Sequence, residues 1–316
     1  MTLTDLRYIV ALARERHFGR AAEKCHVSQP TLSVAVKKLE EQLGVMLFER
    51  SAADVKLTET GRRIVAQAER VLLEAQQVRE IAEAGKDPLA GPLRLGVIYT
   101  IAPYLLPRLI PLMHERAPHV PLVIQENYTA SLASALKRGE LDVIVIALPF
   151  EEPGIVAQPL YDEPFRVVMP AGHAWAALPR VPATRLMEEP LLLLGAGNCF
   201  RDQVLEVCPR CAPGSGSGLQ KTLEGSSLET IRHMVATGVG VTVLPSAAAD
   251  SLPDTQNLVE VRPFEAPEPY RTVALAWRVT YPRNGIIDVL REAILNSALP
   301  GARPIRGAAV ELPAAS

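Results

Sequence analysis

The 316-residue chain lacks any long apolar run, and this absence limits what kind of protein it can be. Its longest apolar stretch, Val143–Phe150, is far shorter than the roughly 20 residues that a membrane-spanning helix needs. Asp5 and Arg7 interrupt the first apolar stretch, which argues against a signal peptide. The sequence therefore predicts a protein with no membrane segment.

The chain also has few cysteines and a small net charge. Four cysteines in a chain without an export signal indicate thiols in a reducing cytoplasm, where a disulfide is more often regulatory than structural. The net charge of −2 argues against a protein that coats a polyanion along its whole length. The charge is uneven, because residues 1–63 carry 11 Lys and Arg against 8 Asp and Glu, and this leaves room for a small basic domain.

The first 60 residues predict short helices joined by tight turns. Ser28-Gln29-Pro30-Thr31 is a helix-start signal in which Ser28 caps the helix and proline is tolerated in the first turn. Leucine or valine then recurs every third or fourth residue as far as Leu43, and Gly44 is a natural C-terminal cap. A short hairpin is expected around residues 50–57.

A helix that follows a tight turn and opens with polar residues is typical of a helix-turn-helix. Its first side chains can read base edges in the major groove, while lysine and arginine neutralise phosphates. A generic three-helix module is the alternative interpretation. The residues predicted to contact double-stranded DNA are Ser28, Gln29, Pro30, Thr31, Ser33, Lys37 and Arg50.

A long helix is predicted from Thr60 to Ala84, followed by a hinge at residues 85–92. Its apolar residues alternate in steps of four and three, which is the heptad pattern of a dimer interface. The alternative is a helix that packs on its own chain. The predicted heptad positions are Ile64, Ala68, Val71, Ala75, Val78 and Ala82.

Beyond the hinge, short apolar segments alternate with amphipathic ones. This pattern predicts an α/β region of about 200 residues. The tail after Leu299 is rich in Pro, Gly and Ala and is expected to be disordered. The predicted strands are 93–98, 122–126, 142–147, 166–169, 191–194, 240–244 and 273–277, with helices between most of them, for example 131–137 and 228–236.

Cys199, Cys208 and Cys211 lie close together in GNCFRDQVLEVCPRC. Cys199 begins a helical stretch, where unpaired N–H groups and the positive end of the helix dipole favour a thiolate, and Arg201 adds a positive charge close in sequence. If residues 199–208 stayed helical, Cys199 and Cys208 would lie roughly 13 Å apart. A disulfide needs Cα atoms within about 7 Å, so a bond between them requires local unfolding.

Several interpretations of the cysteines stay open on this pattern. The three can be incidental core residues, a thiol switch, or a metal site, although a closed zinc site needs a fourth ligand. Cys25 is interpreted as a small buried apolar residue. A peroxidase or reductase is disfavoured because the chain has no Gly-rich dinucleotide fingerprint and no nucleophile elbow, and because such an enzyme has no use for a helix-turn-helix.

The segment FGRAAEKCHVSQPTLSVAVKKLEEQLGVMLFER resembles the winged helix-turn-helix of LysR-type transcriptional regulators, and the likeness extends over nearly the whole chain. It implies an α/β protein with an N-terminal winged helix-turn-helix, a long linker helix and a regulatory domain of two lobes like those of periplasmic binding proteins. The implied boundaries are 1–58 for the DNA-binding domain, 59–90 for the linker and hinge, 91–161 with 267–299 for lobe one, 162–266 for lobe two, and 300–316 for the tail.

CFRDQVLEVC together with SLETIRHMVATGVGVTVLP resembles a hydrogen-peroxide-sensing group within that family. The likeness implies that Cys199 attacks peroxide and becomes a sulfenic acid, that Cys208 resolves it to a disulfide, and that refolding activates oxidative-stress genes. This sequence departs from the group in two ways: Asn198 stands where many members carry His, and the extra thiol of Cys211 puts the resolving partner in question. The implied peroxide-binding residues are Thr100, Thr129, Asn198 and Arg271, although each threonine can equally be a structural cap and Arg271 a surface arginine.

The same resemblance implies partners and a location. They are operator DNA, a homotetramer built from linker-helix dimers, RNA polymerase, and cytosolic thiol reductants such as glutaredoxin, all in the cytoplasm and without a cofactor or metal. The alternative function is a LysR-type regulator that responds to a small metabolite bound between the two lobes.

Overall fold

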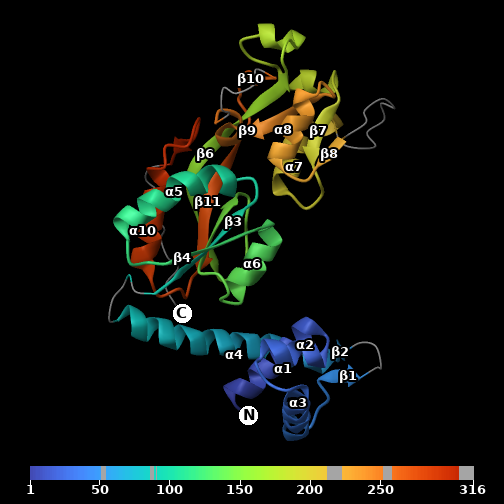
Figure 1. Ribbon diagram of the computed structural model, residues 1–316, viewed down its shortest axis with the longest axis vertical. Coiled ribbons are helices and arrows are strands. Elements are labelled where there is room, and N and C mark those ends of the chain that lie inside the picture. Colours follow the sequence, from blue (N-terminus) through green and yellow to red (C-terminus); the bar gives the residue numbers. More distant parts are fainter. Residues whose placement is uncertain (51–54, 86–88, 90, 212–222, 252–257, 306–316) are drawn as a thin grey trace. The chain divides into compact units, whose positions relative to one another are not determined.

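The computed structural model describes residues 1–50, 55–85, 89, 91–211, 223–251 and 258–305. The chain divides into two compact units, Met1–Gly85 and Lys86–Ser316 (Figure 1). In the part that the structure describes, no helix combines the length and the hydropathy that crossing a membrane requires.

The first unit is a helical bundle with a small β-hairpin. Ser28 caps α3 by accepting a hydrogen bond from the Thr31 N–H, and Gly44 ends that helix with a positive φ of 67°. The hairpin pairs Glu49 with Lys56, so the predicted winged helix-turn-helix is confirmed. The elements are α1 (Leu3–Glu15), α2 (Phe18–Lys24), α3 (Gln29–Leu43), β1 (Phe48–Arg50), β2 (Val55–Leu57) and α4 (Glu59–Ala84).

A buried carboxylate ties α3 to the hairpin. Glu40, on the inner face of α3, accepts hydrogen bonds from the N–H groups of Leu47 and Phe48 at 2.8 and 3.1 Å. Leu32 and Leu39 of the same helix are buried in the core of this unit. The opposite face of α3 therefore stays available at the surface.

The predicted heptad positions of α4 divide into two groups. Ile64 and Ala68 pack into the core of the first unit, so the interpretation of a helix packed on its own chain is correct for this half. Val71 and Val78, one heptad apart, are 37% and 67% exposed. The stretch of α4 from Val71 to Val78 therefore offers apolar side chains to another surface.

The second unit is an α/β fold built on one long sheet. Its principal elements are β3 (Leu93–Ile98), α5 (Ala102–Arg116), β4 (Leu122–Asn127), α6 (Thr129–Lys137), β5 (Val143–Ala147), β6 (Ile155–Pro170), β7 (Leu191–Leu194), α7 (Cys199–Val207), β8 (Leu223–Gly225), α8 (Leu228–Ala236), β9 (Val241–Pro245), α9 (Ser246–Ala249), β10 (Val259–Pro263), β11 (Tyr270–Arg278), α10 (Asn284–Leu295) and β12 (Arg303–Pro304). Single turns of 3-10 helix are η1 (Ala174–Ala177), η2 (Ala183–Met187) and η3 (Pro209–Cys211).

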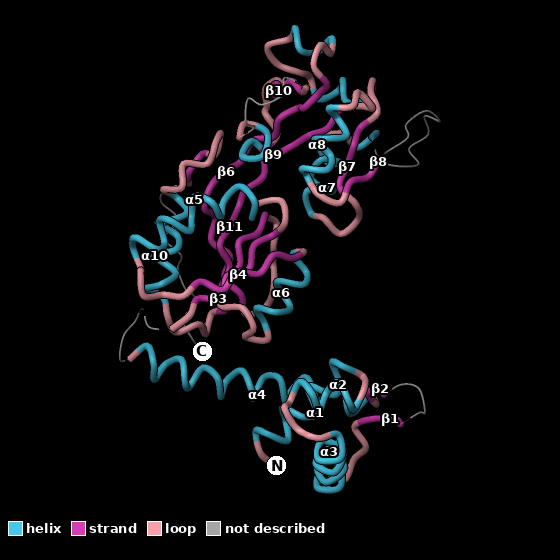
Figure 2. Tube along the Cα trace, viewed as in Figure 1, coloured by secondary structure: helices cyan, strands magenta, loops and turns pink. Residues whose placement is uncertain are grey.

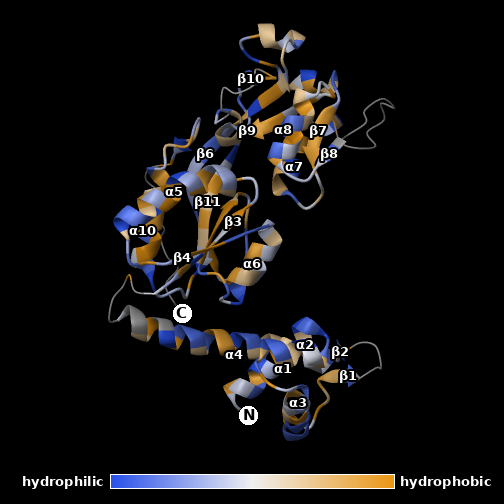
Figure 3. Ribbon diagram, in the orientation of Figure 1, coloured by the Kyte–Doolittle hydropathy of each residue, from blue (hydrophilic) through white to orange (hydrophobic). Residues whose placement is uncertain are grey.

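The strand β6 connects two lobes. Its first part pairs antiparallel with β11, which in turn pairs with β5, and its last residues pair with β9 and β10. The parallel strands β4, β3 and β5 lie on one side of this crossing, and β9, β7 and β8 lie on the other. Each lobe has its own hydrophobic core, and the strands of both are coloured as hydrophobic in Figure 3. Helices α5 and α10 lie on one side of the first lobe's sheet and α6 on the other (Figure 2).

The tail differs from its prediction. Residues 300–305 are ordered, because Arg303 and Pro304 form β12 against β6 and the Ile305 N–H donates to the Leu160 carbonyl. Residues 306–316 lie outside the described part of the chain, as do residues 86–88 and 90 of the predicted hinge at 85–92.

Candidate functional site

Cys199 is the first residue of α7, directly after β7 and a short loop. Gly197 turns the chain there with a φ of +92°, a conformation that favours glycine. The Cys199 thiol is free and half-buried, and it lies where the first N–H groups of α7 have no partner within the helix. The positive end of the helix dipole therefore faces this sulfur.

The two threonines that were predicted to bind peroxide meet at this cysteine. Strands β3 and β4 are parallel neighbours, so the residues that follow them, Thr100 and Thr129, lie at the same edge of the sheet. The Thr129 hydroxyl donates to the Cys199 Sγ across 3.8 Å. Thr100, Thr129, Asn198 and Cys199 all line one cavity of about 10 Å³, which is about the space that a single water needs.

Asn198 lines the cavity, but its side chain is partly committed elsewhere. Its amide nitrogen donates to the carbonyl of Gly195 at 3.1 Å, and its side chain does not cap α7. Asn198 therefore fixes the loop that carries Cys199.

Arg271 is buried and is not the surface arginine of the alternative interpretation. Its guanidinium donates to the Thr100 hydroxyl at 2.8 Å and to the Thr100 carbonyl at 3.0 Å. It does not line the small cavity but holds one wall of it in place. Because the Thr100 hydroxyl accepts from Arg271, its own proton can be donated into the cavity.

Glu163 is a site residue that the sequence did not reveal. It lies opposite Arg271 in the β6–β11 register, and its carboxylate accepts from the Arg271 Nε at 2.8 Å and from the Ala247 N–H at 3.0 Å. The side chains of this ion pair are 1% and 0% exposed. Only the cross-strand register could have identified it, because the two residues are 108 positions apart.

Arg201, whose charge was expected to favour a thiolate at Cys199, is paired with other groups in this structure. The Arg201 guanidinium donates to the carboxylate of Glu224 and to the Leu194 carbonyl, both at 2.7 Å. The positive charge of Arg201 is thus paired with the carboxylate of Glu224 in β8.

Cys208 is the C-terminal cap of α7, and in this structure it forms a disulfide with Cys211. The expected partner, Cys199, is at the opposite end of a continuous helix of nine residues, roughly 13 Å away at 1.5 Å per residue. In this state Cys208 is bonded to the extra cysteine, and the Cys199–Cys208 bond stays a prediction for the peroxide-oxidised state. The Cys208–Cys211 bond also argues against the metal interpretation, because two of the three proposed ligands are bonded to each other.

Cys25 differs from Cys199 in its surroundings. It packs against the core of the first unit, and burial, opposed by the charge of Arg7, raises the pKa of the Cys25 thiol. A raised pKa lowers the thiolate fraction of Cys25 at neutral pH, so this thiol is a weak nucleophile.

The predicted DNA-binding residues lie around the start of α3. Gln29, Pro30 and Thr31 are exposed, and Ser33 is half-buried. The hydroxyls of Ser28 and Thr31 are 2.8 Å apart and form the helix cap, so their first role is structural.

The two basic residues of the predicted set lie further along the chain. Lys37 is exposed and lies 3.7 Å from Glu41, an ion pair that is weak at such a surface. Arg50 ends β1, and its side chain is outside the described part of the chain.

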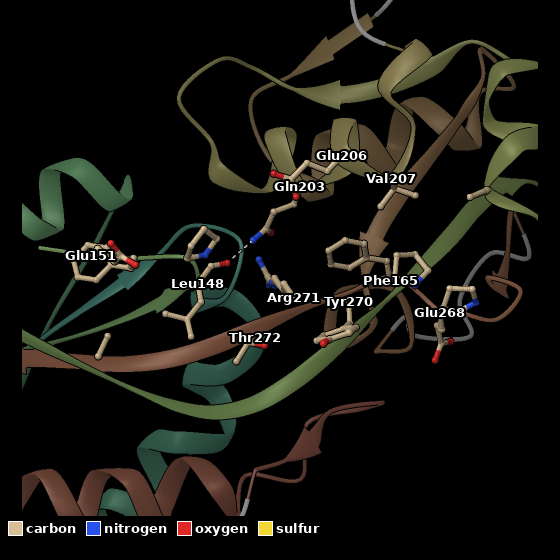
Figure 4. Close-up of a pocket in the computed structure, with 16 residues that line it drawn as sticks. Leu148, Glu151, Phe165, Gln203, Glu206, Val207, Glu268, Tyr270, Arg271 and Thr272 are labelled. Carbon is tan, nitrogen blue, oxygen red and sulfur yellow. Dashed lines mark hydrogen bonds between the residues drawn. The ribbon is translucent and has the colours of Figure 1, made fainter. Parts of the chain in front are cut away.

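A larger cavity of about 910 Å³ lies on the other side of Arg271, between the two lobes (Figure 4). At this cavity Gln203 of α7 donates to the Leu148 carbonyl at 3.2 Å.

A second contact joins the lobes where the Tyr104 hydroxyl donates to Glu229 at 3.1 Å. Burial and the charge of Glu229 raise the pKa of Tyr104 well above its ordinary value, so this donor stays protonated.

Comparisons with known proteins agree with this geometry. Residues 3–62 match the model of the bacterial regulatory helix-turn-helix protein, lysR family, and residues 86–298 match that of the LysR substrate binding domain. The chain is 40% identical over 294 residues to the DNA-binding transcriptional dual regulator OxyR of Escherichia coli (strain K12), covering 93% of this chain and 95% of that protein.

Solved structures are similar over the same length. Full-length OxyR C199D from Pseudomonas aeruginosa has a TM-score of 0.79 and 55% identity, covering 97% of this chain and 98% of that one. A hydrogen-peroxide-bound cysteine-to-serine variant of Corynebacterium glutamicum OxyR has a TM-score of 0.63 and 33% identity, covering 94% and 92%.

Proposed function

The chain belongs to the LysR family of bacterial helix-turn-helix transcription regulators, and we propose that it senses hydrogen peroxide through Cys199. Members of this family are DNA-binding regulators rather than enzymes. The observation that carries the proposal is a free thiol at the start of α7 that shares a cavity of about 10 Å³ with two threonine hydroxyls. A cavity of this size holds about one water, so it favours a small oxidant such as hydrogen peroxide, one oxygen of which can enter, over bulkier oxidants.

The chemistry follows from the groups at the cavity. The Cys199 thiolate attacks one oxygen of hydrogen peroxide, the O–O bond breaks, and the sulfur becomes a sulfenic acid while hydroxide leaves and is protonated to water. Thr129 and Thr100 supply hydroxyl groups that orient the peroxide and support the departing oxygen. Arg271, held by Glu163, fixes the Thr100 hydroxyl for this role.

The Cys208 thiol then captures the sulfenic acid: a Cys199–Cys208 disulfide forms and a second water is released. Because α7 separates the two cysteines by roughly 13 Å, this step requires the helix to unwind. Unwinding exposes Phe200 and Val204, which are buried in the second lobe's core. The disulfide thus converts an oxidation into a change of fold.

A first prediction concerns the Thr129 hydroxyl. Thr129→Val keeps the shape of the side chain but removes the donor to Cys199, so we expect peroxide to react about tenfold more slowly, as the loss of one hydrogen bond to a charged group implies. Stopped-flow measurement of sulfenic acid formation checks this. Thr129→Ser keeps the hydroxyl and should retain most of the rate, and equal loss in both variants would contradict the assigned role.

We further propose how the domains share the work. Residues 1–58 would bind operator DNA, 59–90 would pair two chains, and 91–299 would sense peroxide, with lobe one at 91–161 and 267–299 and lobe two at 162–266. The exposed second half of α4 supports pairing of two chains, and a homotetramer would then be built from such pairs. RNA polymerase is the proposed target of the activated form. Glutaredoxin-like thiol reductants would reduce its disulfide. The reducing cytoplasm is the proposed location.

A second prediction separates base contacts from phosphate contacts. Gln29→Ala should relax sequence preference at one base pair by about 1–3 kcal/mol, because glutamine can pair bidentately with adenine. Lys37→Ala should weaken binding to all DNA and reduce its salt dependence. Titrations of operator and random DNA at several salt concentrations measure both, and equal losses on the two DNAs for both variants would refute the assignment.

A second candidate function is a regulator that responds to a metabolite in the 910 Å³ cavity between the lobes. The number of free thiols distinguishes the two functions. After anaerobic reduction, one equivalent of peroxide should remove two thiols from the chain if it senses peroxide, and this loss should require Cys199. A metabolite sensor would show no such loss that depends on Cys199.

A further inference from the structure

Cys208 belongs to two mutually exclusive disulfides. The structure bonds it to Cys211, whereas the proposed switch bonds it to Cys199. We infer that Cys211 is an internal reductant of the activated switch: its thiolate attacks the Cys208 sulfur, breaks the Cys199–Cys208 bond and releases Cys199 as a free thiolate. This inference rests on the proposed peroxide switch and adds to it a step that ends the signal without an external thiol.

The step balances by itself. A thiolate and a disulfide become a different disulfide and a different thiolate, so no electrons enter or leave the chain. The structure holds the products of this exchange, with Cys208 and Cys211 bonded and Cys199 free in its cavity. A later reaction with a dithiol reductant would open Cys208–Cys211 and return the chain to its fully reduced state.

Proximity favours the attack. Only Pro209 and Arg210 separate the two cysteines, and their Cα atoms lie 5.4 Å apart, within the range of an ordinary disulfide. The Cys211 N–H donates to the Cys208 carbonyl at 2.9 Å, so a single turn of backbone, η3, sets this distance. Because so few residues separate them, Cys211 stays near Cys208 even when α7 unwinds.

The fold gives the exchange its direction. The Cys208–Cys211 bond coexists with an intact α7, whose Phe200 packs against Phe165 at 5.2 Å between ring centroids. The Cys199–Cys208 bond is incompatible with that helix because of the distance between its ends. Each exchange therefore restores the packing of α7, and the chain returns to its resting fold while it still carries one disulfide.

The chain with a Cys208–Cys211 disulfide should also be unable to respond to further peroxide. With Cys208 held by Cys211, a second peroxide can oxidise Cys199 but finds no resolving thiol at the end of α7. The sulfenic acid should then persist or be oxidised further. Peroxide beyond the first equivalent would thus oxidise Cys199 without unwinding α7. The chain would respond again only after the Cys208–Cys211 bond is reduced.

The test follows the disulfides through time. Full-length protein is reduced, freed of reductant under anaerobic conditions, given one equivalent of peroxide, and quenched at intervals by acid and alkylation for mass spectrometry. In the unaltered chain Cys199–Cys208 should form first and convert to Cys208–Cys211 with no reductant added. In Cys211→Ser the Cys199–Cys208 bond should persist about tenfold longer or more, and Cys25→Ser should behave as the unaltered chain.

Three results would overturn the inference. If Cys199–Cys208 lasts as long in the unaltered chain as in Cys211→Ser, the exchange fails while the peroxide switch stands. If Cys208–Cys211 forms equally fast in Cys199→Ser, that bond arises without Cys199 and is no product of exchange. If Cys199–Cys208 forms in neither the unaltered chain nor Cys211→Ser, the peroxide switch itself is wrong and the exchange falls with it.

Discussion

Replacing Cys199 with serine should abolish the response to hydrogen peroxide. The serine hydroxyl does not ionise at neutral pH, so the nucleophile in the cavity of Thr100 and Thr129 disappears while its shape is kept. Peroxide-dependent transcription from an operator in vitro should fall to the level without peroxide. The helix-turn-helix is far away in sequence and unaltered, so binding to DNA in the reduced state should remain.

Two variants serve as controls for this result. Cys25→Ser removes the other free thiol and should leave the response intact, because burial raises the pKa of that thiol. Cys208→Ser should still consume peroxide but accumulate Cys199 as sulfenic and higher acids, since the resolving thiol is missing. A peroxide response that survives in Cys199→Ser would refute the proposed function.

Placing glutamates at Val71 and Val78 should prevent two chains from pairing. Both side chains are exposed on α4, one heptad apart, and in a symmetric pair they would bring like charges into the interface. A buried charge without a partner costs about 3 kcal/mol or more, so dimerisation should weaken roughly a hundredfold and operator binding should be lost with it. Sedimentation velocity measures the assembly.

The matched control adds the same charge elsewhere on α4. Ala66→Glu with Gln67→Glu introduces two glutamates at exposed positions outside the heptad pattern, and this variant should assemble normally. In both double variants residues 91–299 should stay folded, as judged by the thermal unfolding of the protein. Normal sedimentation of the Val71 and Val78 variant would show that α4 does not join the chains.

Local signals predicted much of the fold because capping and periodicity act over a few residues. The strand at 93–98 and the helix at 228–236 have the boundaries that their patterns indicated, and Ser28 and Gly44 cap α3 as expected. The first eleven residues of β6, 155–165, were missed, because Pro159 and Pro164 are atypical of a central strand. Pairing along β11, which is distant in sequence, overrides that local preference.

The candidate site was predictable only in part for the same reason. Thr100 and Thr129 were implied by the family resemblance, and the structure brings them together because each follows a strand and the ends of parallel strands converge. Glu163 could not, because its role depends on the register of two crossing strands. The disulfide between Cys208 and Cys211 depends on the single turn that follows α7, which sequence spacing allows but does not require.

Amide hydrogen exchange shows whether the Cys199–Cys208 disulfide unwinds α7. Cys211→Ser should be oxidised with one equivalent of peroxide, the Cys199–Cys208 bond confirmed by mass spectrometry, and amide exchange compared with the reduced protein. We expect much faster exchange across residues 200–207 in the oxidised form, since the bond cannot form across an intact helix. Unchanged exchange in that segment, with the bond confirmed, would contradict it.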